Sequence, residues 1–227
     1  MENKVKETIR KLYEQIRGKL HLDNGGEFIY ELCFLRYVSV KIFNDLTNQE
    51  SVSIEDLIIK FNEAIDSDDK VKYFNNCINE VNLIKKTLES IEKFIYSVTE
   101  IKEIIVELYS YPDTIIRNIM NYDLLCYDGI RSRFAGTPEQ ICRIVNLFLN
   151  IDENDDVLDI CSSYGNFLVN VGNCCSYKSL TGIEIYNNAS LISKIRLATL
   201  GFNSTIITAD LFSLDYNKKY DKVLCDY

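Results

Sequence analysis

The sequence has 227 residues, a hydrophobic content of 47% and a net charge of −9, the composition of a folded and acidic protein. No apolar run reaches the roughly 18 residues that span a membrane, and the polar first thirty residues lack a signal-peptide pattern. We therefore expect a cytoplasmic protein with no membrane partner. The acidic charge excludes a broad basic surface for nucleic acid, so any DNA contact must be local or come from a partner. Eight cysteines without a CxxC spacing are typical of buried reduced thiols and indicate neither a zinc site nor a disulfide framework.

The first part of the chain, residues 1–130, has the apolar spacing of helices. Residues 27–44 are mostly apolar and predict a helix that is buried on most sides. Apolar residues recur in steps of three and four over 71–108, which predicts one or two helices. These could form a bundle core or a coiled-coil seam, and the shifting register favours the bundle. The Tyr-Pro-Asp sequence at 111–113 predicts a helix end, followed by another helix to about residue 127.

The pattern changes after residue 130, where strands alternate with helices. Thr137 and Pro138 predict a helix start, with Thr137 as the N-cap and Gln140 completing a capping box. The expected strands and helices are then helix 137–150, strand 156–160, a helix to about 173, strand 179–185, helix 187–200, strand 204–208 and strand 220–225. Such alternation predicts parallel βαβ units. The fold class is therefore α/β, with a helical N-terminal domain (1–130) followed by a Rossmann-like sheet (131–227).

Three acidic residues follow successive predicted strands: Asp159, Glu184 and Asp210. Ligands of open parallel sheets lie beyond the carboxyl ends of the strands, so these acids are candidates for one binding site. They suit a nucleoside with an amino-acid tail, because acids can accept hydrogen bonds from ribose hydroxyls, an exocyclic amine and an ammonium group. Acids at these places also cap helices and solvate turns, which is the structural alternative. A dinucleotide dehydrogenase is disfavoured because only Gly165 of a glycine-rich fingerprint is present.

Five segments of the sequence resemble the successive motifs of adenine-specific DNA methyltransferases. They are FAGTPEQI (134–141), VLDICSSYGNFL (157–168), GIE (182–184), ADL (209–211) and YDKVLCDY (220–227). The closest group is the methylation subunit of type I restriction–modification systems, whose amino-terminal helical domain is similar to residues 31–45. The resemblance implies that residues 131–227 form the front half of an S-adenosylmethionine-dependent methyltransferase domain.

The resemblance also implies roles for individual residues. The cofactor S-adenosyl-L-methionine would be held by Thr137, Pro138, Asp159, Ser162, Gly165, Asn166, Phe167, Glu184, Asp210 and Leu211. Among these, Glu184 matches the acid that binds ribose and Asp210 the residue at the adenine. Asp226 and Tyr227 match the first two positions of the catalytic motif.

Three residues depart from the pattern of this family: Ile160 and Tyr227 replace prolines, and Ser163 replaces a glycine. A Cβ at Ser163 would crowd the ligand or require an unfavourable backbone angle. Because the sequence stops within the catalytic motif, we expect an N-terminal part that is inactive alone and can self-associate. It would reach DNA through a specificity subunit and further C-terminal sequence. The alternatives are a non-enzymatic, truncated or degenerate interaction protein, and a methyltransferase that acts on RNA or protein.

Overall fold

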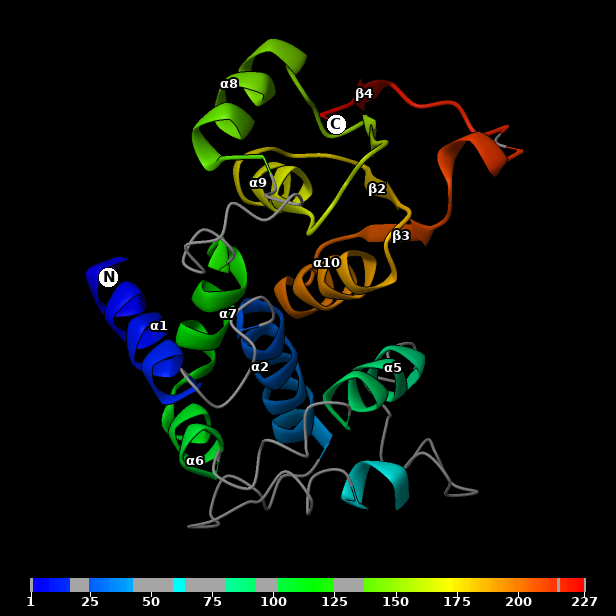
Figure 1. Ribbon diagram of the computed structural model, residues 1–227. Helices are drawn as coiled ribbons and strands as arrows, with labels where there is room; N and C mark the ends of the chain where they lie inside the picture. The colour runs from blue at the N-terminus through cyan, green and yellow to red at the C-terminus, as the bar shows by residue number, and fades with distance from the viewer. Residues whose placement is uncertain are drawn as a thin grey trace. The chain divides into compact units, whose positions relative to one another are not determined.

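A computed structural model describes residues 2–16, 25–42, 59–63, 81–92, 102–124, 137–215 and 217–226 (Figure 1). The chain divides into two compact units, Met1–Ile130 and Arg131–Tyr227. Each unit has its own core, and the two are described separately below.

The first unit is a bundle of helices around one buried helix. Its helices are α1 (Glu2–Ile16), α2 (Gly25–Ile42), α5 (Val81–Glu92), α6 (Lys102–Ser110) and α7 (Asp113–Asn121), with a short helical stretch at 59–63. Helix α2 contacts the other four, and its residues 25–39 are all buried, which confirms the expectation of a helix covered on most sides. Among the described helices, none is both long enough and apolar enough to cross a bilayer.

One helix boundary predicted in this unit agrees with the structure, one differs, and others lie outside the described residues. The apolar pattern over 71–108 corresponds to α5 and α6, although residues 71–80 and 93–101 lie outside the described part. The predicted end at 111–113 is confirmed, because α6 ends at Ser110 and Pro112 is the N-cap of α7. Helix α7 ends at Asn121, earlier than predicted, and residues 125–127 are again not described.

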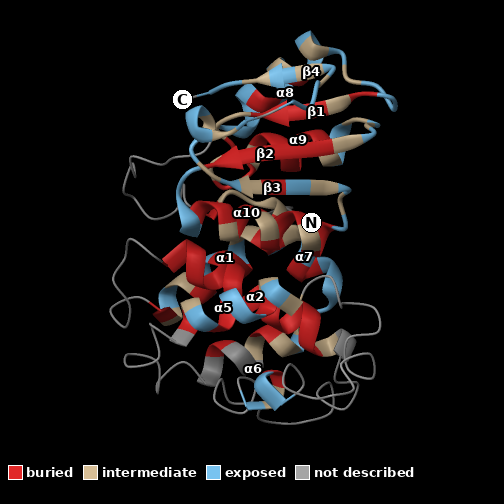
Figure 2. Cartoon of the chain, turned by 90° about the vertical axis from the view of Figure 1, so that its right-hand side faces the viewer, coloured by how far each residue is buried: buried red, intermediate tan, exposed pale blue. Residues whose placement is uncertain are grey.

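The second unit contains a parallel sheet of four strands in the order β3-β2-β1-β4. The strands are β1 (Asp156–Asp159), β2 (Ser179–Glu184), β3 (Ser204–Thr208) and β4 (Lys222–Leu224). The central strands β1 and β2 are mostly buried, whereas β3 and β4 are partly exposed (Figure 2). This arrangement confirms the predicted fold class, a helical part followed by a parallel α/β sheet.

Helices α8 (Glu139–Leu149), α9 (Asn166–Cys174) and α10 (Asn187–Leu200) complete this unit. Helix α9 contacts β2 and α8, and α10 contacts β2, β3 and α9. Two consecutive right-handed βαβ crossovers in the same direction place α9 and α10 on one face of the sheet.

The predicted capping of α8 is wrong. The N-cap is Pro138 rather than Thr137, and no side chain caps the first turn. The Thr137 hydroxyl instead donates a hydrogen bond of 2.7 Å to the Asp226 carboxylate. A residue that resembles a helix cap in sequence therefore connects two distant segments of the chain.

Candidate functional site

The candidate site lies at the carboxyl edge of the sheet, around the point where the strand order reverses. The chain runs outward from β1 through β2 to β3 and then returns to place β4 on the other side of β1. Asp159 pairs in register with Gly182 of β2 and with Leu224 of β4. Loops that leave β1 and β4 in opposite directions open a crevice at such a switch point, which is where ligands of open parallel sheets bind.

Asp159 is a buried carboxylate at the centre of this edge. Only 3% of its surface is exposed, and it accepts a hydrogen bond from the amide of Cys161 at 3.3 Å. Burial, with smaller contributions from the Asp226 and Glu184 carboxylates, raises the pKa of Asp159 from 3.8 to about 7. A buried acid with a raised pKa beside other acids is suited to bind a cation.

Glu184 ends the neighbouring strand β2 and is fixed by backbone amides. One carboxylate oxygen accepts from the amide of Ser163 at 2.7 Å and the other from the amide of Tyr186 at 2.8 Å. Each oxygen retains further acceptor capacity, since an ionised carboxylate offers about four lone-pair positions. Glu184 therefore orders the loop after β1 and can still accept hydrogen bonds from a ligand.

The loop after β1 turns tightly into α9. Ser162 is buried, and its amide and hydroxyl both donate to the carbonyl of Ile183 on β2. Ser163 has a φ of 47° and Gly165 a φ of 79°, both in the left-handed region. The unfavourable backbone angle expected at Ser163 is therefore present. At Gly165 a Cβ would also lie 2.5 Å from the Ser193 hydroxyl.

Thr137 and Asn166 connect this loop to the segment before α8 and to the end of β4. The amide nitrogen of the Asn166 side chain donates to the Thr137 carbonyl at 3.4 Å, while the Thr137 hydroxyl donates to Asp226. The side-chain oxygen of Asn166 accepts from the buried guanidinium of Arg196 at 2.7 Å, and that guanidinium also donates to the carbonyl of Tyr164. Three separate stretches of sequence thus meet around Asp159.

The remaining predicted site residues lie less centrally. Phe167 is buried in α9 and packs in the core. Asp210 accepts from the amide of Phe212 and caps the short 3-10 helix η6 (Leu211–Ser213), the structural role that acids after strands can also have. The amide of Ala209 donates to the Glu184 carbonyl, so this turn lies beside the end of β2. Tyr227 lies outside the described residues.

The two edges of the sheet differ in how their acids are paired. At the amino edge, Asp156 forms an ion pair with Lys178 at 2.7 Å, and Asp155 lies 3.6 Å from Lys222. At the carboxyl edge lie Asp159, Glu184 and Asp226, which we call the acid cluster. No lysine or arginine of the described residues forms an ion pair with any of these three acids. The negative charge of the acid cluster is therefore not neutralised by these residues.

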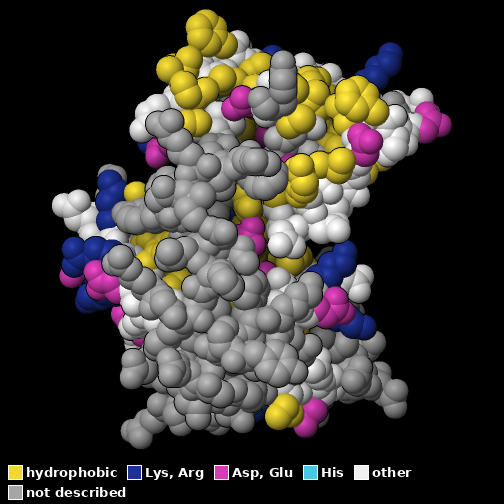
Figure 3. Space-filling model, viewed as in Figure 1, with side chains coloured by type: hydrophobic (Ala, Val, Ile, Leu, Met, Phe, Trp, Pro, Cys, Tyr) yellow, Lys and Arg dark blue, Asp and Glu magenta, His cyan; other side chains and the backbone are white. Residues whose placement is uncertain are grey.

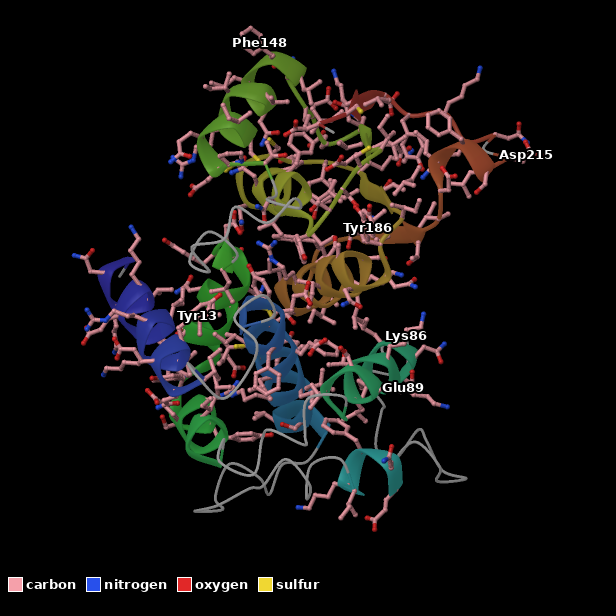
Figure 4. All side chains as sticks on the ribbon, in the orientation of Figure 1. Tyr13, Lys86, Glu89, Phe148, Tyr186 and Asp215 are labelled. Carbon is pink, nitrogen blue, oxygen red and sulfur yellow. The ribbon has the colours of Figure 1, made fainter. Side chains whose placement is uncertain are left out.

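Several residues of the site were not identified from the sequence. Ile185, Tyr186 and Phe212 are large hydrophobic residues that are 56%, 54% and 95% exposed at the ends of β2 and β3 (Figure 4 labels Tyr186). In the sequence, such positions are indicated by large apolar residues that follow an acid at the end of a strand. The buried Arg196 could have been noticed as a cation in a helix whose neighbours are apolar or small.

Fold and site together define a Rossmann-like α/β unit preceded by a helical unit. Two solved structures have the same fold over 99% of this chain. One is the type I restriction–modification system methyltransferase subunit from Streptococcus thermophilus, at 14% identity and a TM-score of 0.62. The other is a modification subunit assigned to a type I restriction enzyme from Vibrio vulnificus YJ016, at 13% identity and a TM-score of 0.54. The chain spans 63% and 60% of those two proteins, respectively.

The likeness is one of structure rather than sequence. No protein-family model and no curated protein matches the sequence. The fold is therefore that of methyltransferase subunits of this kind, in which a helical part precedes the parallel sheet.

Proposed function

We propose that the carboxyl edge of the sheet binds S-adenosyl-L-methionine. The observation that carries this proposal is the acid cluster, which gathers three carboxylates at the switch point without a cationic partner among the described residues. S-adenosylmethionine has a sulfonium, an ammonium group and a ribose diol, so it supplies both positive charge and hydroxyl donors. The residues present therefore fit the cofactor.

Each part of the cofactor has a candidate partner at this edge. Asp159 would bind the ammonium group, and the loop from Ser162 to Phe167 would surround the methionine part. Glu184 would accept from the ribose hydroxyls, because its backbone bonds leave lone pairs available. Exposed apolar residues after β2 and β3, with Leu211 beside them, would flank the adenine, and Asp210 would accept from its amine.

A calorimetric titration tests the cofactor. We expect the chain to bind S-adenosylmethionine weakly and Glu184→Ala to bind it about tenfold more weakly or worse, because charge-assisted hydrogen bonds contribute roughly 1.5–3 kcal/mol each. Glu153→Ala, which removes an exposed acid of the same unit, should bind like the unmodified chain. Absence of heat with the unmodified chain, or equal affinities in all three proteins, would contradict the proposal.

We further propose that the methyl acceptor is the N6 amine of adenine in DNA. The fold of the two type I subunits supports this class of substrate, and Asp226 supports the chemistry. The adenine amine is a poor nucleophile because its lone pair is delocalised into the ring, and the base must leave the helical stack to react. Asp226, held by the Thr137 hydroxyl, would accept a hydrogen bond from that amine, and the carbonyl of Tyr227 would accept a second.

Methyl-transfer assays test the acceptor. We expect no transfer by residues 1–227 alone, since this chain covers only 63% and 60% of the two matched proteins. A longer protein assembled with a specificity subunit should methylate adenine N6, and Asp226→Ala should abolish that activity. Tritium transfer to DNA by the short chain would refute the first expectation. Methylcytosine, methylated RNA or methylated protein as the product would refute the second.

A non-enzymatic interaction role is the second candidate, and one observation favours it. Helix α8 exposes four large apolar residues, which we call the α8 stripe: Ile141, Ile144, Leu147 and Phe148. Their exposed fractions range from 47% to 85%, and a stripe of this kind is suited to bind a partner protein. Binding of S-adenosylmethionine discriminates the two roles, because a purely interacting chain needs no cofactor.

A further inference from the structure

Two cysteines lie together at the switch point, beside the acid cluster. Cys161 follows β1 by two residues and Cys225 directly follows β4. Strands β1 and β4 are hydrogen-bonded neighbours, and the amide of Ile160 donates to the carbonyl of Leu224. The strand pairing therefore brings the two segments that carry these cysteines together at the carboxyl edge of the sheet.

The thiols of this pair lie close enough to interact, and they differ in environment. Burial, followed by the charge of Cys225, raises the pKa of Cys161 to about 11, so Cys161 keeps its proton at neutral pH. Cys225 is exposed and reachable from solvent. The exposed thiol is thus the one that a soluble oxidant meets first.

We infer that Cys161 and Cys225 form a reversible disulfide when the protein meets a peroxide, and that this bond weakens cofactor binding at the adjacent site. The expected effect on cofactor binding rests on the function proposed above. Within the described residues, no cluster of three histidine, cysteine or acidic side chains is arranged to hold a metal ion, so the pair does not fit a metal site there.

The chemistry balances with hydrogen peroxide as the oxidant. The Cys225 thiol releases its proton, its thiolate attacks one peroxide oxygen, and the O–O bond breaks to form a sulfenic acid. The departing hydroxide takes up the released proton and leaves as water. The Cys161 sulfur then attacks the sulfur of that sulfenic acid, the S–O bond breaks, and its hydroxyl leaves as water with the Cys161 proton. Two thiols are oxidised to one disulfide, and one peroxide is reduced to two waters.

The bond would change the geometry of the site. A disulfide requires a sulfur–sulfur distance of about 2.05 Å, well below the separation of two thiols that are not covalently joined. Closing that gap must move the loop after β1, the end of β4 or both. The amide of Cys161 donates to Asp159, and Cys225 directly precedes Asp226, so both acids lie on segments that the bond would shift.

Peptide mapping under non-reducing conditions tests the disulfide itself. The full chain is treated with graded hydrogen peroxide and digested, with Cys174→Ser as the matched control because Cys174 is exposed but lies outside the site. We expect one cross-linked peptide pair containing Cys161 and Cys225, reversed by dithiothreitol, in both proteins. The cross-link should be lost in Cys161→Ser and in Cys225→Ser. A Cys225 that proceeds to sulfinic acid without a cross-link would overturn the proposal.

Titration of reduced and oxidised protein with S-adenosylmethionine tests the consequence. We expect at least a tenfold lower affinity after oxidation, with recovery on reduction and no change in Cys225→Ser. Equal affinities of the reduced and the oxidised protein for S-adenosylmethionine would overturn the inference that the disulfide weakens cofactor binding. If the reduced protein binds no cofactor although the cross-link forms, the proposed function is wrong, but Cys161 and Cys225 still form a disulfide. If the reduced protein binds the cofactor and no cross-link forms, only the proposed disulfide is wrong.

Discussion

At the scale of the residue, the buried carboxylate of Asp159 lowers the stability of the folded protein while it suits the proposed ligand. Its carboxylate is buried without a cationic partner among the described residues, which raises its pKa to about 7. Between pH 4 and 7 the folded chain holds a proton that the unfolded chain has released, so stability falls as pH rises across this window. Above pH 7 the folded protein carries a buried charge that a bound cation would offset.

Replacing Asp159 by asparagine should therefore stabilise the protein. Asparagine keeps an oxygen that can accept from the Cys161 amide but removes the charge, and the expected gain is roughly 2–4 kcal/mol at pH 8, vanishing below pH 4. The same variant should lose affinity for S-adenosylmethionine. Denaturant unfolding across pH, with calorimetry on the same samples, measures both effects.

The control for this prediction lies on the same strand. Lys178 and the Ser179 hydroxyl lower the pKa of Asp156, so its charged form stabilises the fold above its ordinary pKa. Asp156→Asn should consequently destabilise the protein at pH 8, the opposite sign, and leave cofactor affinity unchanged. Destabilisation by both substitutions would show that the burial of Asp159 carries no electrostatic cost.

Part of this site could be predicted from single residues and part could not. The position of Asp159 and Glu184 at strand ends follows from alternating patterns, because a parallel sheet brings its carboxyl ends to one edge. The bond from Thr137 to Asp226 joins residues 89 positions apart, and no local signal distinguishes it from a helix cap. The proximity of the two cysteines likewise depends on the pairing of β1 with β4, which sequence periodicity does not specify.

At the scale of elements, Arg196 couples helix α10 to the loop after β1. Its guanidinium is 1% exposed and donates to the carbonyl of Tyr164 at 2.6 Å and to the side chain of Asn166 at 2.7 Å. One planar group thus holds the turn that precedes α9. Both bonds leave one nitrogen, Nη1, and a lysine would replace the weakly hydrated guanidinium with a compact, strongly hydrated ammonium, which costs more to bury.

We expect Arg196→Lys to cost roughly 2–4 kcal/mol of unfolding free energy, since a buried charge would lose part of its hydrogen bonding. Arg143→Lys is the matched control: Arg143 pairs with Glu139 on the surface of α8 and is 67% exposed, so its replacement should cost less than about 0.5 kcal/mol. Urea unfolding of the three proteins provides the comparison. Equal midpoints for Arg196→Lys and the unmodified chain would show that the loop does not depend on the guanidinium of Arg196.

The elements themselves were largely predictable because each has a clear period. Helix α10 and strand β3 agree with the predicted boundaries, and the left-handed Gly201 ends α10 as a glycine after a helix indicates. Strand β4 is shorter than predicted, with three residues instead of six, since only Lys222–Leu224 pair with β1. The apolar pattern at 220–225 extends beyond the paired residues at both ends, whereas the strand is defined by its hydrogen bonds to β1.

At the scale of the molecule, the second unit exposes apolar side chains on helix α8 and on strand β4. The α8 stripe covers one side of α8, and Figure 4 shows Phe148 projecting outward from the end of that helix. Strand β4 is paired with β1 alone among the described strands, and its Val223 is 53% exposed. The bond from Thr137 to Asp226 ties the start of α8 to the end of β4. Figure 3 shows hydrophobic side chains gathered over this part of the unit.

We therefore expect residues 1–227 to self-associate in the absence of a partner protein. Alternate residues of a parallel strand direct their N–H and C=O groups to opposite neighbours. The Leu224 carbonyl accepts from Ile160 of β1, so the backbone groups of Val223 face the open edge.

Light scattering should give a mass that exceeds that of the monomer and rises with protein concentration. Val223→Lys and Phe148→Glu should each lower it, because a charge at an edge or within an apolar stripe opposes burial. Ile59→Lys, which changes an exposed apolar residue of the first unit, should leave the mass unchanged. A monomeric mass over a wide concentration range would refute association, and equal effects of all three substitutions would refute the assigned surface.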